Sequence, residues 1–262
     1  MNKKMGHLVI LYALVAVGGI ISLYFLVSYL ATILFFLIIP SVYLTLISKE
    51  FVQRSAFFSL SFIGIPLVID GLLILNNAWY VATIFPFKVL NLIPVEDFLF
   101  AFFSIYLIVM LYEYFIEPHP GEKRKDNNLV LVSIVLVASF LCLYFIDPSV
   151  LYIPYAYATV FLFSGFAPTV VFLRSRPGSF KNYFRIAAGC FFFSLFYEIT
   201  ALKIGAWSFP GTQYLSMISF WGVRFPFEEL FFFLIFLPVG VLAYYEFFTY
   251  RKDKKTESSY TS

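Results

Sequence analysis

The chain has 262 residues, of which 61% are hydrophobic and only 13% are charged, against roughly 25% charged in soluble domains. This composition excludes an ordinary soluble protein, and a net charge of +3 carried by dispersed cations offers no basic face for nucleic acid. The two cysteines lie in apolar runs and the two histidines are isolated, which argues against a disulfide framework and against a metal site.

Apolar runs of about twenty residues recur from end to end, which is the pattern of membrane-spanning helices. They predict eight spans, at about 7–27, 29–48, 56–76, 93–115, 129–146, 151–173, 184–204 and 226–249. A turn near 27–30 is inferred because residues 8–47 form one apolar stretch that is too long for a single crossing. We expect no removable signal peptide and a polar, disordered tail at 251–262. The predicted fold is an all-α polytopic membrane protein.

The positive charges predict an orientation, because cytoplasmic loops are enriched in Lys and Arg. With eight spans and a cytoplasmic N-terminus, 15 of the 18 Lys and Arg residues fall on the cytoplasmic side. The other three, Lys88, Lys203 and Arg224, lie at or near the outer side. A seven-span arrangement would place Lys3 and Lys4 outside. The sequence therefore predicts a multi-pass protein of the cell membrane with both termini in the cytoplasm.

The two halves of the chain repeat one another. Asp70 and Glu198 are 128 positions apart, as are Trp79 and Trp207, so each half has an acid, eight residues and then a tryptophan. Further pairs follow at offsets of 132 or 133: Glu96 with Glu228, Asp97 with Glu229, and Tyr112-Glu113 with Tyr245-Glu246. Four spans per unit give both units the same direction in the membrane. We predict two tandem parallel four-helix repeats, at 1–120 and 121–250, related by a pseudo-twofold axis along the membrane normal.

Six carboxylates are expected at a similar outer depth, with Lys203 and Arg224 near enough to serve as counter-ions. They are Asp70, Glu96, Asp97, Glu198, Glu228 and Glu229. A purely structural interpretation stays open, since a proline followed by acids is an ordinary helix start. Against it, the first and fourth of these acids lie near helix ends where the dipole disfavours them, and ionisable groups within spans are functional candidates. Glu113 and Glu246 are expected at the cytoplasmic interface.

The repeated acids favour acid–base chemistry. Adjacent carboxylates in a poorly solvated site resist double ionisation, so one of them can keep a proton near neutral pH. Such an acid can protonate an alkene, and a neighbouring carboxylate can take a proton back. Aromatic faces stabilise cations, and Trp79 and Trp207 are the best candidates because their spacing to the acids is repeated. Without a dinucleotide, Walker or D-D-x-x-D motif, we expect neither cofactor nor metal.

The repeated acid-x8-Trp segment and the P-x-E-[ED] motif resemble the integral-membrane lycopene cyclases. These are made in bacteria and archaea as paired small subunits or one fused chain, and in fungi as part of bifunctional carotenoid enzymes. The resemblance covers about residues 28–116 and 150–249, and it implies lycopene β-cyclase activity that involves the six acids. Ile69-Asp70 and Tyr197-Glu198 stand where the family often has Trp-Asp, and each unit has an extra opening span.

Three functions remain open. In a lycopene β-cyclase, protonation at C2 gives a cation at C1, the C5=C6 bond attacks it, and loss of the C6 proton leaves a β-ring. A hydratase or a cyclase of another carotenoid is the second, and a proton-coupled transporter is the third, although acids at one depth form no relay. The expected partners are a lipophilic carotenoid and membrane lipid. Within the site we favour Glu228 and Glu229, because Arg224 one turn away can hold one of them ionised.

Overall fold

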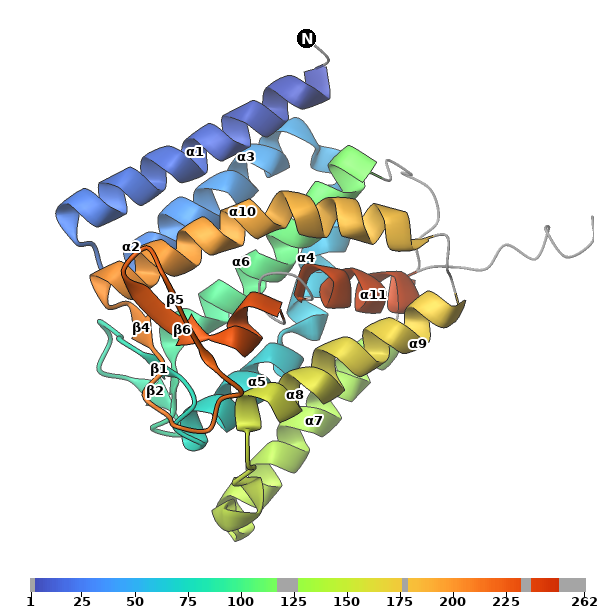
Figure 1. Cartoon of the computed structure of the whole chain (residues 1–262). Helices are drawn as coiled ribbons and strands as arrows, with labels where there is room; N and C mark the ends of the chain where they lie inside the picture. The colour runs from blue at the N-terminus through green and yellow to red at the C-terminus, as the bar shows by residue number, and fades with distance from the viewer. Residues whose placement is uncertain (1–2, 117–126, 176–178, 232–236, 250–262) are drawn as a thin grey trace, which may run out of the picture.

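A computed structural model of the chain describes residues 3–116, 127–175, 179–231 and 237–249 (Figure 1). The fold is mostly helical (78%), and seven helices in these ranges are long and apolar enough to cross a membrane. The expected span at 226–249 is helical at 227–231 and in α11 (Leu237–Thr249), while 232–236 lie outside the described ranges. The helical character is thus confirmed and the apolar helices are compatible with a polytopic membrane protein, whereas the count of eight stays a prediction. The predicted tail at 251–262 also lies outside the described residues.

The first half contains four of the seven long helices. They are α1 (Lys3–Phe25), the run of α2 (Tyr29–Ile33), the π-helix η1 (Leu34–Ile38) and α3 (Ile39–Ile47), the run of η2 (Lys49–Phe51), α4 (Val52–Phe62) and α5 (Gly64–Leu75), and α6 (Val95–Leu111) with η3 (Tyr112–Ile116). The inferred turn between the first two is confirmed. Leu26 has a positive φ of 48°, and the Ser28 hydroxyl caps α2 by accepting a hydrogen bond from the Ala31 amide.

The second half contains the other three long helices. They are α7 (Asn127–Ile146), the run of α8 (Ala156–Phe161), the π-helix η5 (Leu162–Phe166) and α9 (Ala167–Ser175), and α10 (Phe180–Ile204). A short 3-10 turn, η4 (Pro148–Leu151), precedes α8. Gly205 ends α10 with a φ of 72°, a left-handed conformation that a glycine adopts without steric cost.

Besides the helices, the loops at one end of the bundle form short strands. They are β1 (Tyr80–Val81), β2 (Lys88–Val89), β3 (Ile93–Pro94), β4 (Trp207–Ser208), β5 (Met217–Phe220) and β6 (Val223–Pro226), and they pair antiparallel as β1–β4, β2–β3 and β5–β6. The β5–β6 hairpin turns at Trp221 and Gly222, both with positive φ, as tight hairpins require. These ladders pair backbone groups that long loops between spans would otherwise leave to water.

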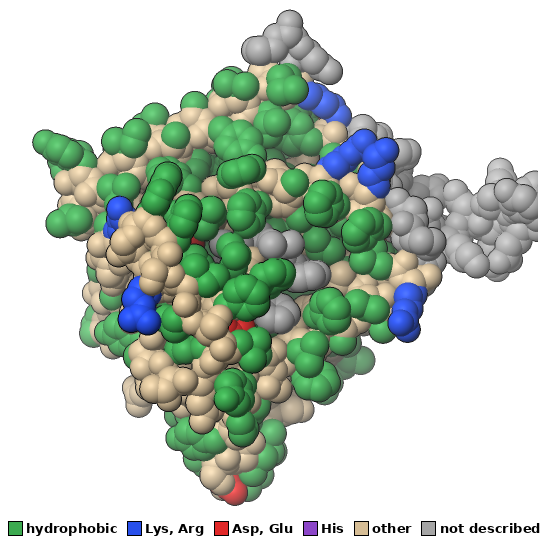
Figure 2. All heavy atoms as spheres, viewed as in Figure 1, with side chains coloured by type: hydrophobic (Ala, Val, Ile, Leu, Met, Phe, Trp, Pro, Cys, Tyr) green, Lys and Arg blue, Asp and Glu red, His purple; other side chains and the backbone are tan. Residues whose placement is uncertain are grey.

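Helix α6 lies in the middle of the bundle (Figure 1). Every residue from 105 to 113 is buried, which is expected of a helix that is apolar all round. By contrast, α7 exposes large side chains such as Leu131, Ile134 and Val135 on the outside of the bundle. Figure 2 shows hydrophobic side chains over most of the visible face, with Lys and Arg near two opposite edges. An apolar belt of this kind suits contact with lipid.

Equivalent residues of the two halves meet one another. The π-helices η1 and η5 are 128 positions apart, and the β1–β4 ladder pairs Tyr80 with Ser208, also 128 apart. The Trp79 and Trp207 rings stack with their centroids 5.8 Å apart. Contacts between equivalent residues are expected where two like units pack across a twofold axis. The division into repeats stays a prediction, and these contacts support it.

Candidate functional site

Two carboxyl groups from different helices meet at the strand-bearing end of the bundle. Asp70 lies in the last turns of α5, and Asp97 lies in the first turn of α6. The two side chains line the same cavity, and the Tyr29 hydroxyl donates to Asp97 Oδ1 over 2.8 Å. The Oδ2 atom of each acid is buried without a hydrogen-bond partner among the described residues. Two carboxyl groups buried in one cavity resist double ionisation, which favours a proton on one of them.

The pair lines a cavity of about 80 Å³ whose other walls include Trp79, Phe100 and Phe161. A single water needs roughly 10–15 Å³, and an engineered apolar cavity of roughly 150 Å³ takes a benzene ring. The cavity therefore has room for a small apolar group beside the two acids. A larger end group requires the lining side chains to move.

A different cavity, of about 60 Å³, lies beside Glu198 and is lined by residues of both halves. Glu198 is buried and accepts a hydrogen bond of 3.0 Å from the Trp207 indole nitrogen. Among the described residues that line this cavity, Glu198 is the sole carboxyl. Phe100 and Leu237 line both cavities, so the two lie on either side of these side chains.

Glu96 and Glu228, the first acids of the two adjacent pairs, each accept hydrogen bonds from a loop at the strand-bearing end of the bundle. The Glu96 carboxylate accepts hydrogen bonds from the Thr83 hydroxyl over 2.7 Å and from the Ile84 amide over 3.0 Å. Glu228 accepts from the Leu215 amide over 2.6 Å, and Leu215 follows Thr83 by the same 132 positions that separate the two acids. The adjacent acids therefore do not act as one pair, because neighbouring residues on a helix point in different directions.

Glu229 does not reproduce the contacts of Asp97. It is fully buried, and neither of its carboxyl oxygens has a hydrogen-bond partner among the described residues. Tyr157, which is equivalent to Tyr29, has a buried hydroxyl that is likewise unpartnered within the described part of the chain. The acid–acid–tyrosine contact of the first half therefore has no described counterpart around Glu229.

The expected counter-ions are not at the acids. Lys203 and Arg224 are exposed, and Arg224 takes the outward position of the alternating strand β6. Within the described ranges, no ion pair joins either cation to a carboxylate, and the ion pair that is seen there joins Arg54 to Glu113. The similar membrane depth expected for the cations and the acids did not imply that they touch. In the case of Arg224, the reason is that a strand points alternate side chains to opposite faces.

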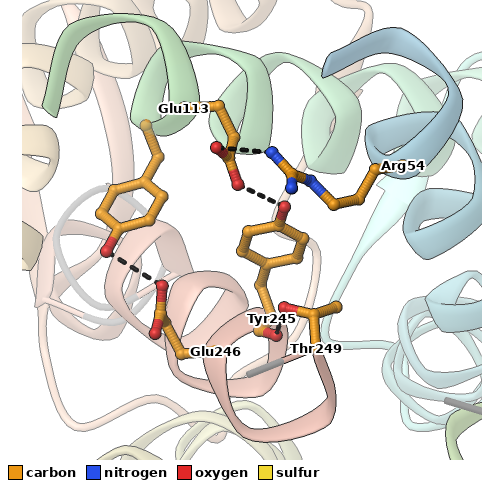
Figure 3. A network of polar contacts seen from close by, with 6 residues as sticks. Arg54, Glu113, Tyr245, Glu246 and Thr249 are labelled. Atoms are coloured by element: carbon orange, nitrogen blue, oxygen red, sulfur yellow. Dashed lines mark hydrogen bonds and ion pairs between the residues drawn. The ribbon is translucent and has the colours of Figure 1, made fainter. Parts of the chain in front are cut away.

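Glu113 and Glu246 are buried inside the bundle (Figure 3), and their expected place at the cytoplasmic interface stays a prediction. Arg54 Nη2 lies 2.8 Å from Glu113 Oε2, and the Tyr245 hydroxyl donates to the other oxygen of this carboxylate. Tyr112 donates reciprocally to Glu246 over 3.0 Å. This cluster lies where η3 meets α11, at the opposite end of α6 from Asp97. The Tyr-Glu dipeptides at 112–113 and 245–246, which are 133 positions apart, were the sequence signal for it.

A hydroxyl fixes the loop above the tryptophan pair. Tyr214 donates to the Ala78 carbonyl over 2.9 Å and accepts from the Gly211 amide over 3.0 Å. Burial raises the pKa of Tyr214 to about 12, so its hydroxyl remains a donor at neutral pH. The loop is therefore held beside Trp79, which forms part of the wall of the acid cavity.

The Asp70–Asp97 pair combines the two features that acid–base chemistry on an apolar ligand needs. It places two carboxyl groups, which resist double ionisation, together in a cavity walled by aromatic rings. When the chain is compared with known proteins, no family model, no curated protein and no solved structure matches it.

Proposed function

We propose that the chain is a membrane-embedded lycopene β-cyclase in which Asp70 and Asp97 transfer the protons. The observation that carries this proposal is the placement of the two carboxyls in one apolar cavity walled by Trp79 and Phe100, with Tyr29 bonded to Asp97. The repeated sequence motifs supply the substrate class, because they resemble those of the integral-membrane lycopene cyclases. The pair differs from the one favoured on sequence, Glu228 and Glu229.

The hydrogen bonds divide the roles within the pair. Asp97 accepts from Tyr29 as well as facing Asp70, so Asp97 is the better place for the negative charge. Asp70 then holds the proton and is the acid that protonates C2 of a ψ-end. The cation formed at C1 is attacked by the C5=C6 electron pair, which makes the C1–C6 bond and moves the charge to C5.

Asp97 completes the reaction as the base. It takes the proton from C6, the electrons of that bond restore the C5=C6 double bond, and a β-ring results. Proton transfer from Asp97 back to Asp70 returns the pair to its starting state, so substrate and product are isomers. The faces of Trp79 and Phe100 favour the cation, by roughly 2 kcal/mol for a desolvated cation–π contact.

Membrane orientation follows from the charges. With 15 of the 18 Lys and Arg residues in segments that share one side, both termini face the cytoplasm of a cell-membrane protein. The acid cavity is then near the outer face, and the Arg54–Glu113 cluster is near the cytoplasmic face. An apolar substrate reaches the acids from the bilayer.

Expression in a lycopene-accumulating host, followed by pigment chromatography, tests the proposal. Cyclised pigment is expected from the wild type, none from Asp70→Asn, and normal amounts from Asp147→Asn, which alters an exposed acid. In heavy water, each ring should retain one deuterium at C2, and the mass should otherwise be that of the substrate. Addition of water to the pigment would instead identify a hydratase, and unchanged pigment would contradict the proposal.

A proton-coupled transporter is the second candidate, favoured by the buried carboxylates at both ends of α6. Asp97 lies at one end, and Glu113 and Glu246 lie at the other. Buried acids near both faces suit a proton pathway better than acids at a single depth. Proton flux into liposomes that contain the purified protein, lost on Glu246→Gln, would favour this candidate. Ring formation without such flux would exclude it.

A further inference from the structure

A third cavity, which is apolar, adjoins the cavity lined by Asp70 and Asp97 (the acid cavity). It has a volume of about 40 Å³, and six of its lining residues also line the acid cavity: Phe62, Pro66, Ile69, Phe161, Leu237 and Val241. Its lining also includes Gly165, Gly240 and Tyr244, which do not line the acid cavity. The two cavities thus form one crevice between α5, the π-helix η5 and α11, with Asp70 and Asp97 at one end.

Two glycines keep this crevice open. A Cβ atom placed on Gly165 would meet no atom of the described residues within 4 Å. A Cβ atom on Gly240 would lie 3.8 Å from the Gly165 Cα, so the two backbones approach each other without side chains between them. Gly165 lines the crevice, so a larger residue there would take up space beside it.

The other half fills the equivalent space. Leu37 precedes Gly165 by 128 positions, occupies the same place in the π-helix η1, and is buried where it lines the Glu198 cavity. Ile108 precedes Gly240 by 132 positions and lies in the wall shared by the Glu198 cavity and the acid cavity. The two glycines therefore leave space that the larger residues of the first half occupy, and this space adjoins the acid pair.

The lining suits an apolar chain. Phe62, Phe161 and Tyr244 contribute aromatic rings. The Ser164 and Tyr244 hydroxyls, which are its polar side-chain groups among the described residues, already donate to the Val160 and Ser164 carbonyls. These hydroxyls therefore have no hydrogen left to donate to a polar ligand. Gly165 itself is partly exposed, beside Phe163 and Phe166 on the outer surface of η5, so a ligand can enter from the side.

We propose that this crevice binds the linear isoprenoid chain of the substrate while its end group lies at Asp70. The assignment rests on the proposed function, and it adds the place where the long apolar part of the molecule lies. It makes Gly165 a specificity-determining residue, because a side chain there would exclude a long chain but leave the acids untouched.

Gly165→Leu tests the assignment, since it introduces the residue found at the equivalent position Leu37. Two substrates with the same ψ-end are compared in detergent: the C40 polyene and an isoprenoid truncated soon after that end. We expect the variant to convert the C40 polyene about tenfold more slowly, which corresponds to roughly 1.4 kcal/mol, and to retain less pigment on purification. Turnover of the truncated substrate should stay within about twofold of the wild type.

Two variants control for bulk and for folding. Ala138→Leu adds the same side chain on the exposed face of α7 and should change neither substrate's turnover. Gly165→Ala adds a Cβ atom to empty space and should behave as the wild type. If Gly165→Leu fails to accumulate, Gly165→Val takes its place with the same expected difference between substrates.

The outcomes separate the two proposals. Equal loss on both substrates, or undiminished turnover and pigment retention with the C40 polyene, would overturn the crevice assignment. A wild type that retains the polyene but forms no ring from either substrate would overturn the cyclase proposal instead. In that case, loss of retained pigment in Gly165→Leu alone would still support the crevice as a binding path.

Discussion

Removing a single hydroxyl group tests whether the two halves of the protein have different roles. Tyr29→Phe deletes the 2.8 Å hydrogen bond to Asp97 but keeps the ring, which packs edge-on against Trp207 with centroids 5.9 Å apart. We therefore expect the fold to persist and the acid pair to lose the donor that favours a carboxylate on Asp97.

The size of the effect follows from the type of hydrogen bond. A hydrogen bond to a charged group contributes roughly 1.5–3 kcal/mol, and about 1.4 kcal/mol changes a rate tenfold. If most of this energy is lost in the transition state, Tyr29→Phe should lower ring formation by about 10–100-fold. The assay is pigment conversion by purified protein at matched concentration, with melting temperature recorded in parallel.

Tyr157→Phe is the matched control. It removes the equivalent hydroxyl, which has no hydrogen-bond partner in the described ranges, from an equally buried ring. Loss of an unpaired buried hydroxyl should cost nothing, so turnover should stay within about twofold and stability should not fall. Equal losses in both variants, or no loss in Tyr29→Phe, would refute the roles given to Tyr29 and Asp97.

Four further outcomes are expected. Asp97→Asn should reduce turnover by at least about 100-fold, as removal of a general acid or base does. Glu229→Gln should reduce it less, and the reverse order would place the proton transfer in the second half. Arg54→Met should destabilise the protein by about 3–5 kcal/mol, because it leaves a buried carboxylate unpaired, whereas Arg224→Met at an exposed site should leave the melting temperature unchanged. Gly211→Ala should cost about 1–3 kcal/mol in thermal unfolding, since its Cβ would lie 2.7 Å from a backbone oxygen; an unchanged melting temperature would show that the loop can move. Reporter fusions at the two termini should both report the cytoplasm, and opposite sides would contradict eight spans.

The helical spans were predictable because hydropathy and length determine them. A stretch of forty apolar residues cannot cross once, so a turn was required, and the structure has it at 26–28. The short strands were not predictable in the same way. Their pairing joins segments far apart in sequence, as β1 and β4 show, and two-residue strands have no periodicity to detect.

The candidate acids were found by their repetition, but their pairing was not. Sequence proximity pointed to Glu96 with Asp97, whereas a helix turns successive side chains about 100° apart. One of the two therefore faces the loop at Thr83, and the other faces Asp70 on a different helix. Only the packing of α5 against α6 decides which acids meet, and no local pattern reports that packing.

The two halves share a topology yet present different chemistry at their acids. In the first half, Asp70 and Asp97 line one cavity, and Tyr29 donates a hydrogen bond to Asp97. Their equivalents in the second half are the glutamates Glu198 and Glu229, and Trp207 donates a hydrogen bond to Glu198. The same tryptophan stacks on Trp79 and packs edge-on against Tyr29, so the second half supplies a wall to the site of the first. One half can therefore carry the proton transfer while the other encloses it, and substitutions that disturb Trp207 should impair a site whose acids are all in the first half.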